Sequence, residues 1–278
     1  NNVTYDRSAP SITTATIASN NTTDDILAVP DNTVTLTFIS DEDIQTPTVT
    51  IATQTATVVA GADAKNWTAT YIMTNNESNG TVPFEITYMD LASNAGSAQT
   101  ALINDVDGAV TFDKTQPSLS VITLTSDNTI NNAYGREGSI LTLAFSASEQ
   151  LNSTQMAVTI ATQAVTPSIT TAWNGTAEIW AASYTLSGSD YTGQSGVTIP
   201  FTIDYEDLNG YDGTQVTEAA AAAAMTFDRN APTITSYTAA SSSGTNFAKA
   251  NDVITLTLVA NENIDEPVIT IAGKTKPG

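Results

Sequence analysis

The stretch VTFDKTQPSL, residues 110–119, is the key to the fold because the chain carries it three times. The other copies are VTYDRSAPSI at 3–12 and MTFDRNAPTI at 225–234. The aspartates of the three copies are separated by 107 and 115 residues, at Asp6, Asp113 and Asp228. An interval of this length is the size of one ordinary domain, so we expect each copy to mark a joint between tandem domains.

Further segments recur in the same order between these joints. The recurring segments are TVTLTFISDEDI (33–44) with SILTLAFSASEQL (139–151) and DVITLTLVANENI (252–264); TPTVTIAT (46–53) with QMAVTIAT (155–162) and EPVITIAG (266–273); WTATY (67–71) with WAASY (180–184); and VPFEITYMDL (82–91) with IPFTIDYEDL (199–208). Agreement at several ordered positions indicates that one fold is repeated along the chain.

Each recurring segment alternates apolar and polar residues, which predicts a half-buried β-strand. In TVTLTF, for example, Val34, Leu36 and Phe38 share one face and threonines occupy the other. In the first copy we expect strands at 11–19, 33–40, 46–53, 55–60, 67–73 and 82–89, with a last strand ending in the next VTFD. The expected aromatic core residues are Trp67, Tyr71, Phe84, Tyr88, Trp180, Tyr184, Phe201 and Tyr205. About seven strands in about 110 residues predict an all-β chain of tandem immunoglobulin-like β-sandwiches.

Three motifs carry a resemblance to a known family. The joint TFDKTQP (111–117), the strand LTFISDEDI (36–44) and the turn DLASNAG (90–96) resemble those of tandem immunoglobulin-like, cadherin-like repeats in large bacterial or archaeal cell-surface proteins. The resemblance implies an extracellular structural protein, a spacer or assembly unit of an adhesin stalk, a surface layer or a filament. The second copy departs from the pattern with DLNGYDG (207–213) and with the run Ala219–Ala224, where we expect a loop or a short turn of helix.

The repeat also sets the expected domain boundaries. Residues 1–6 end a preceding repeat, 7–113 form repeat 1, 114–228 form repeat 2, and 229–278 form a partial repeat 3. The partial repeat holds only about three strands, which would expose an apolar face and open strand edges. We expect either that the remainder lies outside this sequence or that a neighbouring subunit completes the fold by strand addition.

The composition excludes several classes of function. The chain of 278 residues has no cysteine and no histidine, which removes disulfides, thiol chemistry and histidine-dependent catalysis. Paired acids on neighbouring strand positions face opposite ways and do not suit a glycosidase, so we expect no enzymatic activity. A formal charge of −21 with only eight Lys and Arg argues against nucleic acid and against an anionic membrane surface as partners. The expected partners are other copies of the chain or adjoining repeats, with surface glycans as a second candidate.

Carboxylates are expected to gather at the joints. In the predicted topology the joint aspartate, the acid after the second strand and the acid after the sixth strand lie at one end of each domain. The candidate calcium ligands are Asp6, Glu42 and Asp90 in the first copy; Asp113, Glu149 and Asp207, with Asp107 approaching, in the second; and Asp228 and Glu262 in the third. Calcium binds six to eight oxygen ligands, so it would compensate such a cluster and stiffen the joint.

Two alternatives to these sites stay open at the level of sequence. The acids could be solvated turn residues, or each joint aspartate could accept hydrogen bonds from nearby backbone or pair with Arg7, Lys114 or Arg229. The chain also carries no EF-hand or nonapeptide calcium motif. Trp173 is a candidate platform for a sugar in an adhesive module, or a hairpin residue that packs on its own domain.

Overall fold

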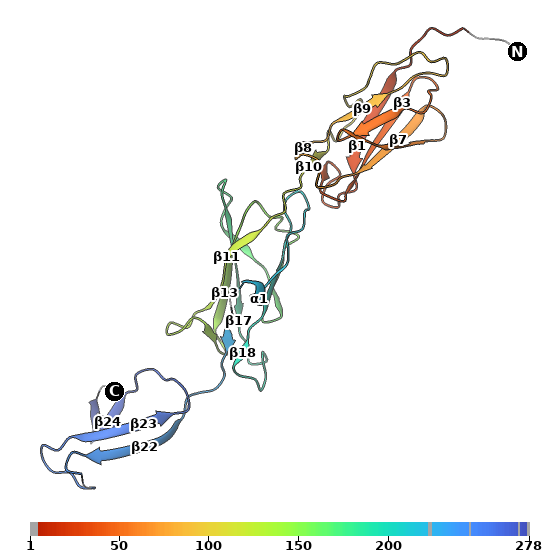
Figure 1. Cartoon of the computed structure of the whole chain (residues 1–278). Helices are drawn as coiled ribbons and strands as arrows, with labels where there is room; N and C mark the ends of the chain where they lie inside the picture. Colours follow the sequence, from red (N-terminus) through yellow and green to blue (C-terminus); the bar gives the residue numbers. More distant parts are fainter. Residues whose placement is uncertain (1–4, 222–223, 245, 272, 277–278) are drawn as a thin grey trace. The chain divides into compact units, whose positions relative to one another are not determined.

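The computed structural model describes residues 5–221, 224–244, 246–271 and 273–276 and shows an all-β protein built from several small sheets (Figure 1). The one helix in these ranges is α1 (Glu218–Ala221), which overlaps the start of the alanine run and confirms the expected short helical turn. Residues 222–223 lie outside the described ranges, as do residues 1–4 of the predicted preceding repeat. None of the helical structure in the described ranges has the length and apolar character needed to cross a bilayer. The chain divides into two compact units, Asn1–Asp190 with Thr198–Thr226, and Tyr191–Val197 with Phe227–Gly278.

The first part of the chain contains two main sheets. The four-stranded sheet has the order β1-β3-β7-β6, with β1 (Ile12–Ser19), β3 (Thr33–Ser40), β7 (Asn66–Ile72) and β6 (Thr57–Ala60). The three-stranded sheet has the order β5-β4-β9, with β5 (Gln54–Thr55), β4 (Thr48–Ile51) and β9 (Phe84–Thr87). The six strands expected from the alternating segments are therefore confirmed, although several are shorter than the segments.

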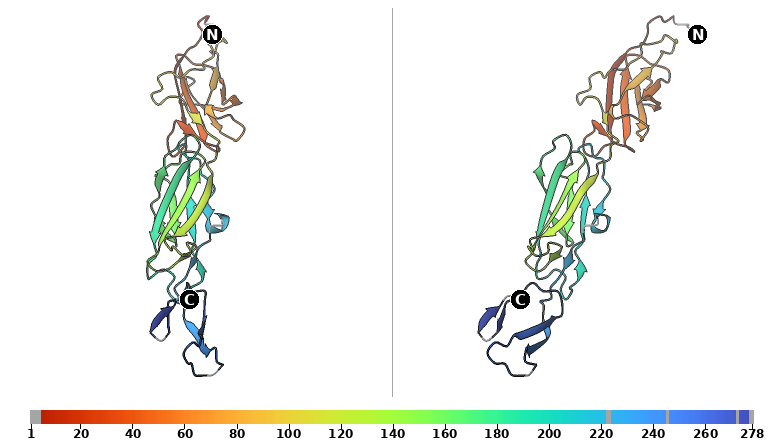
Figure 2. Two further views of the ribbon diagram at one scale, coloured as in Figure 1. Left: turned by 90° about the vertical axis from the view of Figure 1, so that its left-hand side faces the viewer. Right: turned by 60° about the vertical axis from the view of Figure 1, so that its left-hand side comes forward.

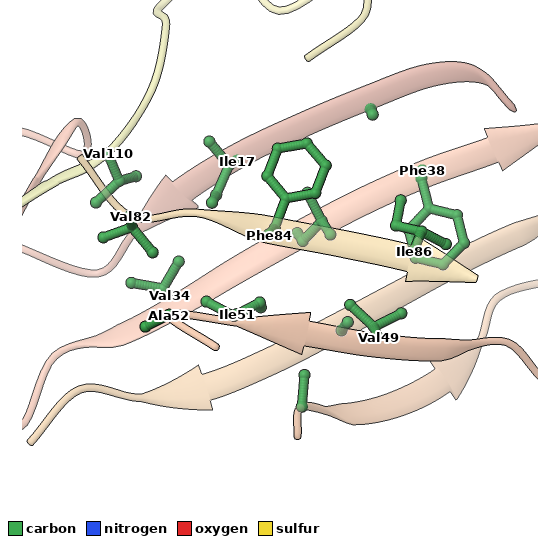
Figure 3. Packing of buried hydrophobic residues seen from close by; sticks show 14 of the residues in the cluster. Ile17, Val34, Phe38, Val49, Ile51, Ala52, Val82, Phe84, Ile86 and Val110 are labelled. Atoms are coloured by element: carbon green, nitrogen blue, oxygen red, sulfur yellow. The ribbon is translucent and has the colours of Figure 1, made fainter. Parts of the chain in front are cut away.

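Side chains from both sheets pack into one core. Val34, Leu36 and Phe38 on β3 are fully buried, as their alternation with threonine predicts. Figure 3 shows Phe84 and Ile86 of β9 directed toward the same interior. Burying each large apolar side chain contributes about 1.5–3 kcal/mol, so this shared interior holds the two sheets together.

The same strand order recurs farther along the chain. The second four-stranded sheet has the order β11-β13-β17-β16, with β11 (Leu119–Ser126), β13 (Ile140–Ala147), β17 (Glu178–Thr185) and β16 (Ser168–Thr171), and its long strands are green and yellow in Figure 2. Its companion has the order β15-β14-β19-β20, with β15 (Gln163–Val165), β14 (Ala157–Ile160), β19 (Phe201–Asp204) and β20 (Val216–Thr217). Even the register is kept, because Phe38 pairs with Trp67 and Phe145 pairs with Trp180.

Of the eight expected core aromatics, six are buried and two are half-buried. Tyr71 and Tyr184 are the half-buried pair. Each directs its hydroxyl to a carboxylate, that of Glu77 at 2.6 Å and that of Asp190 at 2.8 Å. A tyrosine hydroxyl needs a polar partner, and these two hydroxyls find theirs in carboxylates six positions farther along the chain.

The last strand expected in each domain is much shorter than predicted. β10 (Thr111–Phe112) covers only two residues and lies in a separate sheet of order β2-β10-β8, with β2 (Leu27–Ala28) and β8 (Gly80–Thr81). A matching sheet has the order β12-β21-β18, with β12 (Tyr134–Gly135), β21 (Thr226–Phe227) and β18 (Val197–Thr198). The segment before β10 pairs with β9 through an isolated bridge, Ile86 with Gln99, and left-handed residues such as Asn104 and Gly108 interrupt its extended backbone.

The second unit contains two hairpins. β22 (Ile234–Ser241) pairs with β23 (Ile254–Ala260), and β24 (Ile269–Ile271) pairs with β25 (Lys274–Lys276). The sequence predicted about three strands here, and β25 is the additional one. Apolar side chains on these strands are exposed, including Tyr237 at 74% and Val259 at 50%, as expected for a sheet without a covering layer.

Candidate metal centre

The structure brings Asp113, Glu149 and Asp207 together. One carboxylate oxygen from each lies within 4.8 Å of the other two. Asp113 directly follows β10, whereas Glu149 and Asp207 lie in the loops after β13 and β19. A β-bridge between Leu151 and Asp207 ties these two loops together, which explains how acids far apart in the sequence converge.

Asp207 is the most constrained member of this cluster. Its side chain is only 1% exposed, and its Oδ1 accepts hydrogen bonds from the backbone N–H groups of Asn209 (2.7 Å) and Tyr211 (2.8 Å). Its Oδ2 is buried and has no hydrogen-bond partner within the described part of the chain. Burial raises the pKa of Asp207, and the charge of Asp113 adds to the effect, while the backbone hydrogen bonds oppose it. A buried carboxylate oxygen without a partner costs about 1–3 kcal/mol, so this atom favours a bound proton or cation.

The pKa of Glu149 is also raised. Burial, followed by the negative charges of Asp207 and Asp113, raises the pKa of Glu149 to about 7 from its ordinary 4.5. Three carboxylates at this separation repel one another unless one is protonated or a cation lies among them. The cluster therefore has the donor set of a hard-cation site, with oxygen ligands alone.

Asp113 joins the cluster to its surroundings through hydrogen bonds. Its Oδ1 accepts from the backbone N–H of Thr115 and from Asn79 Nδ2, both at 2.8 Å. Its Oδ2 accepts from Asn209 Nδ2 at 2.9 Å. Sequence reasoning missed both asparagines, because each lies in a turn whose position depends on the folded chain; the departure DLNGYDG was the only signal for Asn209.

The backbone alternative considered from the sequence is also present. Each joint aspartate accepts from the N–H two residues later: Asp6 from Ser8 at 2.9 Å, Asp113 from Thr115 at 2.8 Å, and Asp228 from Asn230 at 2.9 Å. In each turn the backbone N–H donates to Oδ1, so the turn orients the carboxylate without requiring Oδ2. The repeated aspartate thus has a local structural role that is compatible with binding a cation.

A second cluster contains Asp6, Glu42 and Asp90, again with oxygens within 4.8 Å of one another. Burial and the charges of Asp6 and Asp90 raise the pKa of Glu42. Asp90 differs from Asp207, because Asn94 satisfies both of its oxygens, with its backbone N–H at 2.7 Å and its Nδ2 at 2.7 Å. Burial raises the pKa of Asp90, but the hydrogen bonds from Asn94 and the backbone outweigh burial, and the net shift is downward. This cluster opens into a shallow depression of about 540 Å³ that Lys65 also lines.

The difference between the clusters follows from the turns DLASNAG and DLNGYDG. The turns have equal length, and Asn94 in the first occupies the position of Tyr211 in the second. Both close with the same bridges, Met89 with Ala95 and Glu206 with Asp212. Tyr211 has no side-chain amide, so Asp207 Oδ2 lacks the hydrogen-bond donor that Asn94 Nδ2 provides to Asp90 Oδ2.

The remaining candidate ligands do not join a cluster in the described part of the chain. Asp107 is exposed and donates its backbone N–H to Asp105 Oδ1 at 3.0 Å, while Asp105 Oδ2 accepts from Ile17 N at 2.8 Å. These bonds hold the pair against β1, which explains why Asp107 is not among the acids gathered at Asp113. Asp228 accepts from Ser195 Oγ at 2.8 Å. Glu262 has a buried Oε1 without a hydrogen-bond partner in the described ranges.

Trp173 lies in the loop between β16 and β17, with a half-buried side chain. This placement matches the expected hairpin residue. It does not test the proposed role in binding a sugar.

Comparison with known proteins gives little further information. No family model and no curated protein matches the chain. Among solved structures, the chain is similar to the crystal structure of Rst D1-D2, with 7% sequence identity over 80% of this chain and 100% of that chain and a TM-score of 0.34. A TM-score this low supports no conclusion about the family or function of this chain.

Proposed function

We propose that the chain consists of tandem immunoglobulin-like β-sandwiches, with repeats at 7–113 and 114–228 and a partial repeat at 229–278. The recurring sheet order and the core that receives side chains from two sheets support this architecture. In this proposal the chain is an extracellular spacer or assembly unit of an adhesin, a surface layer or a filament, without enzymatic activity. The partners are adjoining repeats or other copies of the chain.

Calcium at the Asp113–Glu149–Asp207 cluster is the chemical part of the proposal. The observation that carries it is the buried Asp207 Oδ2, which has no hydrogen-bond partner in the described ranges and belongs to a cluster with two other carboxylates. Calcium accepts six to eight oxygen ligands, including backbone carbonyls and Asn side chains, and the cluster supplies only oxygen. A bound calcium would replace repulsion among these carboxylates with attraction and so stabilise the joint at Asp113.

The charge of the chain agrees with this role. At −21, the chain repels itself strongly at low ionic strength, and bound or screening cations reduce that repulsion. A salty extracellular setting supplies both kinds of cation.

Thermal unfolding of the chain in calcium and in chelator tests the proposal. A ligand that binds only the folded state stabilises it, by about 2.7 kcal/mol when its concentration is 100 times the Kd. We therefore expect calcium to raise the Tm of the wild type, and we expect the D207N variant to lose most of that increase. The E85Q variant is the matched control, because Glu85 lies exposed on β9 outside both clusters. Equal melting of the wild type with and without calcium would refute the calcium site.

A further inference from the structure

The turn Asp207–Tyr211 connects the cluster to a distant loop of the same unit. Asp207 Oδ1 holds the turn by accepting from the N–H groups of Asn209 and Tyr211. The turn closes on itself as well, because Asp207 N donates to the carbonyl of Tyr211 at 3.1 Å. The Asp207 side chain, which belongs to the cluster, therefore also sets the shape of the turn.

Asn209 makes contacts on both sides. Its Nδ2 donates to Asp113 Oδ2 at 2.9 Å, within the cluster. Its backbone carbonyl accepts from Asn21 Nδ2 at 2.8 Å, in the loop that follows β1. One residue thus bridges the acid cluster and a residue 188 positions away in the sequence.

The loop that receives this contact is held in place by its own hydrogen bonds. Asn21 N donates to Ser19 Oγ at 3.0 Å, Asn21 Oδ1 accepts from Thr23 N at 2.8 Å, and Asn21 Nδ2 also donates to Asn32 Oδ1 at 3.1 Å. The two loops are in close contact, because a Cβ added to Gly210 would lie 2.7 Å from Thr23 Oγ1. Gly210 has a φ of +77°, so glycine suits both the backbone and the space at this position.

We propose that this turn is a cation-dependent latch, defined as Asp207–Tyr211 together with Asn21, in which a divalent cation bound at the cluster fixes Asn209 against Asn21. The inference rests on the proposed calcium site. A cation held by Asp113 and Asp207 fixes the two carboxylates that position Asn209. Asp113 accepts from the Asn209 side chain, and Asp207 accepts from the Asn209 backbone N–H. Without the cation, the repelling carboxylates move apart and the Asn209–Asn21 contact loosens. Asn21 is therefore a positioning residue that does not bind the ion itself.

Linkage gives the latch a measurable consequence. If the cation strengthens the Asn209–Asn21 contact, then this contact must strengthen cation binding by the same factor. Loss of one hydrogen bond of this kind predicts a fall in calcium affinity of about fivefold in the N21A variant.

Distance measurements between two spin labels test the latch directly. The chain has no cysteine, so cysteines introduced at the exposed positions Thr57 of β6 and Ser168 of β16 carry the only labels. In the otherwise wild-type chain, calcium should narrow the distribution of label distances relative to chelator. In N21A the distribution should stay broad in both conditions. N76A is the matched control, because Asn76 is exposed in another loop, and it should behave like the wild type.

Calorimetric titration of calcium into the same proteins separates the latch from the site on which it rests. Wild-type protein that binds no calcium would overturn both proposals. Protein that binds calcium through Asp207, but whose label distances are the same in calcium and chelator or the same in N21A and wild type, would overturn the latch alone. The N21D variant guards against a folding defect, because it keeps the acceptor for Thr23 N while replacing the donor to Asn209. It should reproduce the broad distribution.

Discussion

At the scale of single residues, the contrast between Asp90 and Asp207 explains why two similar turns differ in chemistry. Both aspartates are 1% exposed and follow equivalent strands. Asn94 satisfies both oxygens of Asp90, whereas Tyr211 supplies only a backbone N–H to Asp207. The side chain at the fifth position of the turn thus determines whether both oxygens of the buried carboxylate have hydrogen-bond donors or one oxygen lacks a donor.

This contrast predicts opposite effects of the same substitution. In chelator at neutral pH, D207N should raise the free energy of unfolding by about 1 kcal/mol, because it removes a repelling charge and gives the unpartnered position a donor. D90N should lower it by about 1–3 kcal/mol, because an amide NH₂ then faces a donor of Asn94. Urea unfolding of both variants and of the wild type measures these changes. Effects of the same sign in the two variants would contradict the assignment.

The raised pKa of Glu149 predicts that the free energy of unfolding depends on pH. Its pKa is about 7 in the folded chain against an ordinary 4.5, so between these values the folded chain retains a proton that the unfolded chain has released. The contribution of Glu149 to stability is fully present below about pH 4.5 and is lost as the pH rises to about 7.

In chelator, the Tm of the wild type relative to E149Q should therefore fall across this range of pH. The difference between the two proteins cancels the contributions of carboxylates with lowered pKa, such as Asp90, which act in the opposite direction. A Tm difference that stays constant from pH 4.5 to 7 would contradict the raised pKa of Glu149.

The glycine that ends each turn allows close packing of a tyrosine. A Cβ at Gly213 would lie 2.1 Å from Cε2 of Tyr205, which is 5% exposed and has no room to move outward. We expect G213A to lower the free energy of unfolding by about 1–3 kcal/mol. G188A is the control, because its Cβ would meet only the flexible end of Glu137. Thermal unfolding of the two variants should show a clear loss for the first and little change for the second.

At the scale of secondary-structure elements, the long strands could be predicted and the tight turns could not. TVTLTF alternates so regularly that its burial follows from sequence, and β3 has the predicted bounds of Thr33–Ser40. The segment 46–53 was predicted as one strand, but β4 ends at Ile51 because Ala52 and Thr53 adopt left-handed φ values of 50° and 66°. Asn-Gly usually marks such a two-residue turn, so Ala-Thr gave no signal.

The same turn recurs at Ala161 and Thr162, with φ values of 54° and 65°. A left-handed conformation costs a residue with a Cβ about 1–2 kcal/mol, and glycine avoids this cost at some loss of unfolded-state entropy. We expect T162G to raise the free energy of unfolding by about 0.5 kcal/mol. T171G, on the exposed strand β16, should lower it instead. A loss of stability in T162G, measured by urea unfolding, would show that the turn is not strained.

At the scale of the whole molecule, the repeat predicted which acids converge but not what surrounds them. Asp113, Glu149 and Asp207 could be grouped from sequence because the joint and the loops after two recurring strands lie at one end of the predicted fold. The contact between Asn209 and Asp113 joins residues 96 positions apart and depends on the final packing of the turn. No local sequence pattern therefore predicts it. For the same reason, the lack of a hydrogen-bond partner for Asp207 Oδ2 could not be predicted from the sequence.

The central claim is that this cluster binds calcium through Asp207, and calorimetric titration tests it most directly. Calcium titrated into the wild-type chain at pH 7.5 should give a saturable binding signal, and the affinity should fall as the pH is lowered through about 7, where Glu149 takes up its proton. The signal from this site should disappear in D207N and persist in E85Q. A wild-type chain that gives no binding signal, or a D207N variant that binds calcium as tightly as the wild type, would contradict the claim.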